Sequence, residues 1–127
     1  MNAWEEGFLK GLKPQELLTV NQWADKHRVL SSRGSSEPGK FRTDRTPYMK
    51  EPMEELSTGS LTQRVVLMFA SQTGKTESMN NWTGYCIDFA PGALLLCQPT
   101  LQMAARLSKQ RLEPMLLETP CLAEKIP

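Results

Sequence analysis

The feature that most constrains the fold is an apolar stretch, residues 65–68, that leads directly into the loop Phe69-Ala70-Ser71-Gln72-Thr73-Gly74-Lys75-Thr76. In phosphate-binding loops a buried strand delivers the backbone to a tight turn, and a helix begins where the turn ends. That helix directs its free N–H groups and the positive end of its dipole at the phosphates. The order strand, loop, helix therefore predicts a nucleoside triphosphate site.

Each residue type in this loop has a predicted role. The nucleotide-binding residues are Ser71, Gln72, Thr73, Gly74, Lys75 and Thr76. Gly74 allows close approach of the backbone, the Lys75 ammonium would contact the β- and γ-phosphates, and Lys75 is the predicted catalytic residue. The Thr76 hydroxyl would take one position around Mg²⁺. Phe69 replaces the first glycine of the usual pattern, so a turn that merely caps a helix is the alternative interpretation.

Two short apolar segments, residues 64–69 and 93–97, lie on either side of a helix-length connection. Strands that are covered on both faces need no polar alternation, so this order is typical of a parallel β-α-β unit and an α/β fold. The connecting helix carries Met79, Trp82, Cys86 and Ile87 at helical spacing, which predicts that this face packs on the sheet.

Further helices are expected on both sides of this unit. Residues 4–12 have helical spacing, and residues 20–28 follow Thr19 as a cap, with Val20, Trp23 and Ala24 on one face. Residues 30–40 are rich in Ser, Gly and Pro and predict a loop. We therefore divide the chain into an N-terminal helical segment with a basic linker, residues 1–45, and a catalytic part, residues 46–127.

The catalytic part begins with a predicted helix of about ten residues, for which Thr46-Pro47 provides the cap and the first position. Near the end of the chain Thr100 is expected to cap a helix that points Leu101, Ala104, Ala105 and Leu112 inward. Residues 113–118 are expected to form a last short helix, with Pro114 near its start and Pro120 beyond its end.

Charge is concentrated in one region. The net charge of +1 gives no global reason to expect a nucleic acid. Residues 26–50, however, contain seven basic side chains against Glu37 and Asp44. They are Lys26, Arg28, Arg33, Lys40, Arg42, Arg45 and Lys50. A solvated basic loop and a surface that contacts DNA both remain possible interpretations.

Other site classes are excluded by composition. Cys86, Cys97 and Cys121 are too few and too far apart for a zinc cluster, and an odd number argues against a disulfide framework. We expect buried thiols in a reducing compartment. With His27 as the single histidine, a multi-His metal site cannot be built. No stretch approaches the roughly eighteen apolar residues of a membrane span, so no membrane partner is expected.

Several short blocks occur in a recognisable order. They are Trp23-Ala24-Asp25, Thr46-Pro47-Tyr48, Arg64-Val65-Val66-Leu67-Met68, the loop to Thr76-Glu77, Cys97-Gln98-Pro99-Thr100 and Arg111-Leu112-Glu113-Pro114-Met115. From about residue 18 onward, this pattern resembles the large subunit of phage terminases of the lambda, or GpA, type. The resemblance implies a P-loop NTPase domain of the RecA/ASCE-like, parallel-sheet kind, preceded by a short helical segment.

The resemblance also implies a function and site residues. Members of that family are ATP-driven motors that package double-stranded DNA into procapsids, with a C-terminal nuclease. Residues 71–76 take the Walker A role, and Tyr48 falls where such enzymes place an aromatic residue near the adenine. Met49 stands where the family usually has Gln, and the loop has no early basic residue, which leaves the charge to Lys75.

The implied cofactors are ATP and Mg²⁺. The implied partners are double-stranded DNA, the terminase small subunit, the portal protein of the procapsid and further copies of the large subunit in the motor. The implied location is the cytoplasm of the bacterial host.

One expected part is missing from the sequence. Phosphoryl transfer needs a Walker B carboxylate for Mg²⁺ and a residue that positions water, and no apolar run ending in Asp-Glu follows the second predicted strand. We therefore expect an incomplete domain that does not hydrolyse ATP alone. Two alternatives stay open: a superfamily 2 helicase or translocase, whose first motif is close to residues 70–76, and a non-catalytic interaction module with a structural nucleotide loop.

Overall fold

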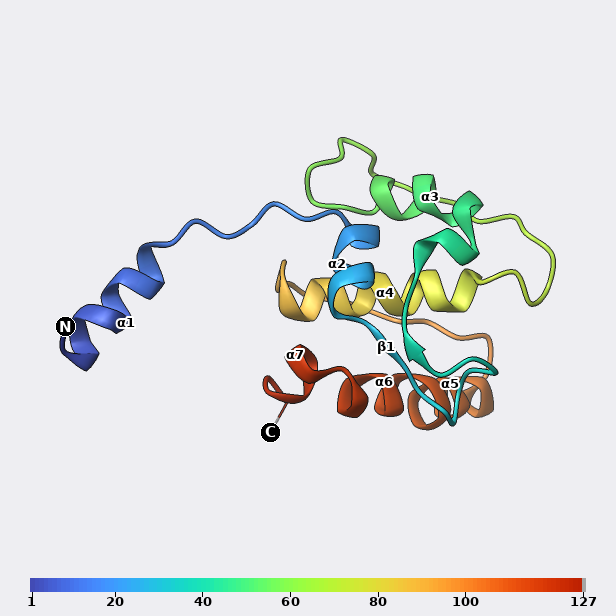
Figure 1. Ribbon diagram of the computed structural model, residues 1–127. Coiled ribbons are helices and arrows are strands. Elements are labelled where there is room, and N and C mark those ends of the chain that lie inside the picture. The colour runs from blue at the N-terminus through green and yellow to red at the C-terminus, as the bar shows by residue number, and fades with distance from the viewer. Residues whose placement is uncertain (127) are drawn as a thin grey trace.

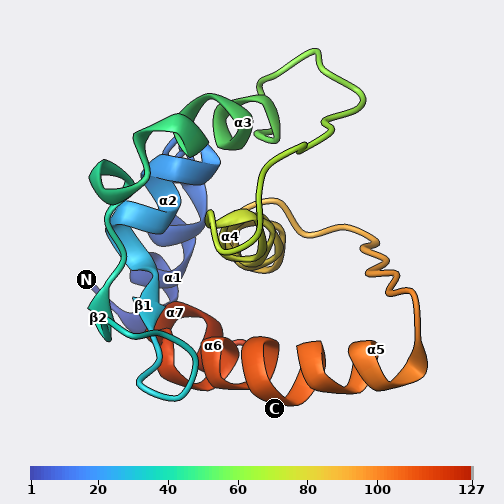
Figure 2. The same cartoon turned by 90° about the vertical axis from the view of Figure 1, so that its right-hand side faces the viewer.

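The computed structural model describes residues 1–126 as a mainly helical chain with one small two-stranded sheet (Figure 1). In chain order the elements are α1 (Ala3–Leu12), α2 (Val20–His27), β1 (Val29–Leu30), β2 (Gly39–Lys40), the 3-10 helices η1 (Thr43–Arg45) and η2 (Pro47–Met49), α3 (Lys50–Glu55), α4 (Lys75–Asp88), α5 (Leu101–Leu107), the π-helix η3 (Ser108–Leu112), α6 (Glu113–Glu118) and α7 (Pro120–Ala123). Helix α4 lies at the centre, with α2 and α3 on one side and α6 and α7 below (Figure 2).

Helix α2 starts where the sequence predicts. The Thr19 side chain accepts a hydrogen bond from the Gln22 backbone N–H, and the Gln22 side chain accepts one from the Thr19 N–H at 3.1 Å. Asp25, further along α2, then anchors the next segment. Its Oδ1 accepts hydrogen bonds from the backbone N–H of Thr43 at 2.7 Å and from the Thr43 hydroxyl at 2.8 Å. These bonds fix the start of η1 against α2.

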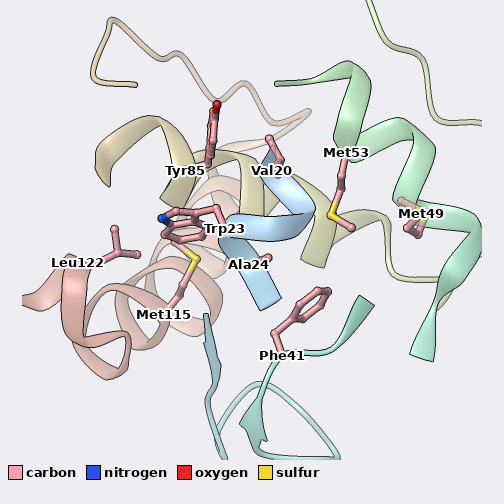
Figure 3. Close-up of a cluster of buried hydrophobic side chains, with 9 residues drawn as sticks. All are labelled: Val20, Trp23, Ala24, Phe41, Met49, Met53, Tyr85, Met115 and Leu122. Atoms are coloured by element: carbon pink, nitrogen blue, oxygen red, sulfur yellow. The ribbon is translucent and has the colours of Figure 1, made fainter. Parts of the chain in front are cut away.

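The hydrophobic core forms around Trp23. The predicted inner face of α2, Val20, Trp23 and Ala24, is fully buried. It packs in one cluster with Tyr85 of α4, Met115 of α6 and Leu122 of α7, together with Phe41, Met49 and Met53 (Figure 3). The cluster thus draws side chains from both sides of residue 45, and the domain boundary placed there stays a prediction.

Helix α4 forms as predicted, but it buries a different face. The buried residues are Ser78, Asn80, Asn81, Thr83, Gly84 and Tyr85. The predicted face of Met79, Trp82, Cys86 and Ile87 is only half-buried. Two residues of this face meet partners from outside the helix: Asn81 accepts a hydrogen bond from Arg28, and Gly84 makes room for Trp23. The Asn80 side chain is buried without a hydrogen-bond partner within residues 1–126. The apolar face lacks the sheet that was expected to cover it.

The two predicted strands do not form within residues 1–126. Residues 61–70 and 91–98 have no ladder partner, so the prediction of a parallel β-α-β unit is wrong for this structure. Both segments run past α4 on the side away from α2 (Figure 2). Val66 is 71% exposed and Leu95 is 84% exposed. Parallel strands need paired neighbours and cover on both faces, and these segments have neither.

The sheet that does form lies where the sequence predicts only a loop. Strand β1 pairs antiparallel with β2, with Val29 opposite Lys40 and Leu30 opposite Gly39. Gly39 has a φ of 123°, a conformation that favours glycine. Strands of two residues are too short to show an alternating pattern, which explains why the hairpin was missed.

The C-terminal helices agree with the sequence in position and differ in burial. Thr100 caps α5 by accepting a hydrogen bond from the Met103 N–H, as predicted, but Leu101 is 90% exposed rather than inward. Helix α6 has the predicted bounds. Helix α7 was missed because Pro120, which was expected to end a helix, occupies the first position of a new one.

Near Thr46 the expected ten-residue helix is divided into η2 and α3, and the Thr46 side chain makes no cap bond. Helix α1 is capped by Asn2 and has no buried residue. It projects away from the other helices (Figure 1). Within residues 1–126, no helix is both long enough and apolar enough to cross a membrane.

Candidate functional site

The loop before α4 has the backbone geometry of an anion-binding turn. Gly74 immediately precedes the helix with a φ of 93°, in the left-handed region that favours glycine. Gln72 also has a positive φ, at 61°. Alternation of left-handed and ordinary residues is the geometry in which successive N–H groups can line a concavity. Helix α4 then begins at Lys75 and ends at Asp88, so its dipole points its positive end at this turn.

The predicted loop residues are brought together at the start of α4. The Lys75 ammonium folds back over the turn and donates to the carbonyl oxygens of Phe69, at 2.7 Å, and Ala70. The Thr73 hydroxyl donates to the same Ala70 carbonyl at 2.8 Å. Thr76 is exposed and makes no side-chain hydrogen bond within residues 1–126. The carbonyls thus hold the ammonium at the mouth of the turn.

Tyr48 lies against the same loop from a distant part of the chain. Its hydroxyl donates to the Thr73 carbonyl at 2.9 Å, and its ring centre lies 5.9 Å from that of Phe69. The ring is half-exposed, which leaves a face open beside the turn. The neighbouring Met49 is buried in the core, with its Cγ 3.9 Å from a Cβ built on Gly74. Met49 therefore supports the loop from below and does not face a ligand.

An open cleft of about 770 Å³ runs along this loop. Its lining comes from the loop and the start of α4, residues 71–77, from Thr46 and Tyr48, from residues 34–36 between the two strands, and from Arg111. All the predicted nucleotide-binding residues line it. Among the lining side chains the charged ones are Lys75, Glu77 and Arg111. The cleft is therefore a polar site with a net positive lining.

Beside this cleft the Glu77 carboxylate forms ion pairs with two arginines, Arg28 and Arg111. Arg28 is buried, and it donates from Nη2 to the Glu77 carboxylate at 2.9 Å and from Nη1 to Asn81 at 2.7 Å. Burial lowers the pKa of the Arg28 guanidinium, and the Glu77 charge opposes that shift. Arg111 approaches the other oxygen of Glu77 at 3.7 Å. Glu77 is thus already neutralised.

The sequence analysis did not assign these three residues to the site. Glu77 lies two positions after Lys75 in the first turn of α4, which is a signal that could have been used. Arg28 was counted only as part of the basic segment, and Arg111 only as part of a short block in the resemblance. Nothing local in the sequence indicates that residues 28, 77 and 111 meet.

The residues in the cleft fit Mg²⁺ only as a partner of bound phosphate. Residues 1–126 contain no cluster of three His, Cys, Asp or Glu side chains that could hold a metal ion. The exposed Thr76 hydroxyl offers one oxygen, and magnesium commonly completes its shell with phosphate and water. A dedicated all-protein metal site is therefore absent from the described chain.

The seven basic side chains of residues 26–50 fall into two groups, those that form ion pairs and those that do not. Four of its seven side chains have acidic partners: Lys26 with Glu16, Arg28 with Glu77, Arg45 with Glu37 and Lys50 with Glu54. Arg33, Lys40 and Arg42 are exposed and have no ion pair within residues 1–126. Only these three remain available as a basic surface.

The cysteines are free, but they are not all buried. Cys86 and Cys121 are half-buried and Cys97 is exposed, which corrects the expectation of three buried thiols. Burial raises the pKa of the Cys86 thiol. Burial, with the nearby Asp88 carboxylate, raises the pKa of Cys121 to about 11. Neither half-buried thiol is activated as a nucleophile.

Known proteins support the terminase resemblance. No solved structure matches the chain. The "Terminase, large subunit" of Enterobacteria phage P21 is 31% identical over 121 residues, which is 95% of this chain and 18% of that protein. The chain therefore spans less than a fifth of the length of this relative. The family model described as "Phage terminase large subunit gpA, ATPase domain" matches residues 35–127. On these two matches, the chain belongs to the family of phage terminase large subunits of the gpA type, within the ATPase domain.

Proposed function

We propose that this chain binds ATP with Mg²⁺ at residues 71–76 and forms the N-terminal ATPase part of a motor that packages double-stranded DNA into procapsids. The observation that carries the proposal is the start of α4, where a left-handed Gly74 precedes the helix and the Lys75 ammonium is held over the turn. Family membership supplies the packaging context.

The chain's own groups suit phosphate binding. The Lys75 ammonium rests on neutral carbonyl oxygens, with no acidic partner in residues 1–126, so a bound triphosphate would offer it stronger, charge-assisted bonds. Gly74 gives the backbone close approach, and the dipole of α4 adds partial positive charge. Bound magnesium would neutralise phosphate charge, and Thr76 is the residue we assign to hold it. Tyr48 is assigned to the base, since its ring lies open beside the loop.

The proposed fold is a RecA/ASCE-like P-loop NTPase domain, of which residues 46–127 form the first part. Residues 61–70 would become a strand of its parallel sheet. Val65 and Leu67 are half-buried while Val66 and Met68 are exposed, so successive side chains alternate between two faces, as they do in a strand. The half-buried apolar face of α4 would then pack on that sheet.

The partners we assign belong to the whole motor. They are double-stranded DNA, the terminase small subunit, the portal protein and other copies of the large subunit, in the cytoplasm of the bacterial host. The family match does not favour a superfamily 2 helicase. The remaining alternative, a loop with only a structural role, predicts that the protein does not bind nucleotide, whereas our proposal predicts that it does.

The test is Lys75→Ala in the purified protein. Loss of one charge-assisted contact should weaken Mg·ATP binding at least about tenfold, and it should abolish ATP turnover in the complete large subunit. Lys10→Ala is the matched control, because it removes the same charge from the exposed helix α1. Circular dichroism checks that both variants fold. Equal ATP affinity in wild type and Lys75→Ala would rule out the proposed site.

A further inference from the structure

Arg111 lines the candidate nucleotide cleft and comes from a part of the chain distant from the loop. It lies in η3, a π-helical stretch between α5 and α6, and such stretches occur frequently at functional sites. Its guanidinium crosses to two other segments: Nη1 donates to the Gly34 carbonyl and lies 3.7 Å from Glu77. The loop between β1 and β2 accordingly lies beside the C-terminal helices in both views (Figures 1 and 2).

These contacts use only one end of the guanidinium. Within residues 1–126, no hydrogen bond is made by Nε or Nη2 of Arg111, and 42% of the side chain is exposed. The anchoring contacts therefore fix the position of the group while most of its five N–H donors stay free. A planar fork with free donors is suited to bidentate recognition of phosphate oxygens.

The charges that line the cleft also favour an anionic ligand. Glu77 is the one carboxylate in the lining, and the buried Arg28 already pairs with it at 2.9 Å. Arg28 is buried, and both of its terminal nitrogens are engaged, Nη1 with Asn81 and Nη2 with Glu77, so it does not face a ligand. Lys75 and Arg111 are then two cations that line one cleft, and Glu77, its one lining carboxylate, already pairs with Arg28. A polyanion bound in the cleft would offer both cations a charged partner.

From this geometry we infer that Arg111 is a second phosphate-binding residue, which contacts the phosphate chain of the nucleotide together with Lys75. This inference rests on the proposed ATP site and adds a residue from a distant part of the chain to it. Because Arg111 also holds Gly34, phosphate binding would fix the loop of residues 34–36 over the nucleotide.

The inference predicts a nucleotide-dependent defect. Affinity of the purified protein for Mg·ATP and Mg·ADP is measured for wild type, Arg111→Ala and Arg111→Lys. Loss of a charge-assisted contact should weaken binding of Mg·ATP about 10- to 100-fold in Arg111→Ala. Arg111→Lys keeps the charge without the fork, so its affinity should fall between the two. Arg106→Ala is the matched control, since Arg106 lies on α5 outside the cleft.

Thermal melting separates this role from a structural one. Without nucleotide, Arg111→Ala should melt near the wild-type temperature, because its contacts are exposed, and the upward shift caused by Mg·ATP should shrink. A lower melting temperature without nucleotide, accompanied by an unchanged ATP shift, would assign Arg111 to structure and overturn the inference. Lys75→Ala distinguishes the two proposals. If Lys75→Ala loses binding and Arg111→Ala keeps it, only the role of Arg111 is wrong; if Lys75→Ala keeps it, the site itself is wrong.

Discussion

Gly84 on α4 lies directly against the indole of Trp23 on α2, so closely that a Cβ at residue 84 would be 2.5 Å from Cη2 of the ring. The absence of a side chain lets the two helices approach, and Trp23 is fully buried at this contact (Figure 3). The position of α4, and with it the loop at its start, depends on this close packing.

The first prediction follows from that contact. Gly84→Ala should destabilise the fold by about 1–3 kcal/mol, because neither the indole nor the helix backbone can move away without loss of packing. Chemical denaturation measures the change. Gly7→Ala is the control: its Cβ would meet nothing within 4 Å, and alanine favours a helix, so no loss is expected there. Equal stability of Gly84→Ala and wild type would contradict the contact.

Gly74 gives a prediction about the loop. A residue with a side chain is strained at its φ of 93°, whereas a Cβ at this position would make only ordinary van der Waals contacts. A substitution at residue 74 should therefore destabilise the protein through backbone strain and not through a clash. Gly74→Ala should lower stability by about 1 kcal/mol, and it should weaken Mg·ATP binding because the turn relaxes. Gly59→Ala, in open space with no positive φ, should change neither quantity. Calorimetric titration with denaturation curves provides both measurements.

Asp88 predicts a dependence of stability on pH. Burial raises the pKa of its carboxyl, but the hydrogen bonds from Lys125 and Trp23 and the charges of Lys125 and His27 outweigh burial, so the net pKa is lowered. The Trp23 Nε1 lies 2.8 Å and the Lys125 Nζ 2.6 Å from the carboxylate oxygens. A lowered folded pKa stabilises the fold above the unfolded value of about 3.9, and that contribution is lost as the pH falls through the folded pKa.

The comparison is with Asp88→Asn. The difference in unfolding free energy between wild type and this variant should be constant near neutral pH and shrink below about pH 4. Asp44→Asn removes the same charge from an exposed position and should cost no more than about 0.5 kcal/mol. A wild-type advantage that persists unchanged to pH 2 would show that the carboxylate charge is not what stabilises the contact.

The unpaired part of the basic segment predicts a DNA surface. Replacing Arg33, Lys40 and Arg42 together with Ala should weaken binding to double-stranded DNA and reduce the slope of log K against log salt by up to about three charge contacts. The matched triple variant replaces Lys26, Arg45 and Lys50, which are engaged with Glu16, Glu37 and Glu54. Fluorescence anisotropy over a salt series gives both slopes. If the two triple variants have the wild-type slope, the segment is a solvated loop.

Local signals in the sequence determined several helix starts and ends and the position of the loop. The Thr19 and Thr100 caps, the apolar face of α2 and the bounds of α6 are all set by neighbouring residues, so they could be predicted. The same holds for the start of α4 behind Gly74, since a residue tolerant of positive φ and a following helix are local properties.

Tertiary structure alone decided which face of α4 is buried and which side chains reach the cleft. Asn81 is buried against Arg28, a residue from beyond its own helix, and the predicted strands depend on neighbours that a ladder must supply. Arg28, Glu77 and Arg111 come together across a sequence separation of 83 residues only because α2, α4 and the C-terminal helices pack in one core. Ion pairs across such separations leave no periodic signal in a sequence, because their geometry is created by the packing that brings the helices together.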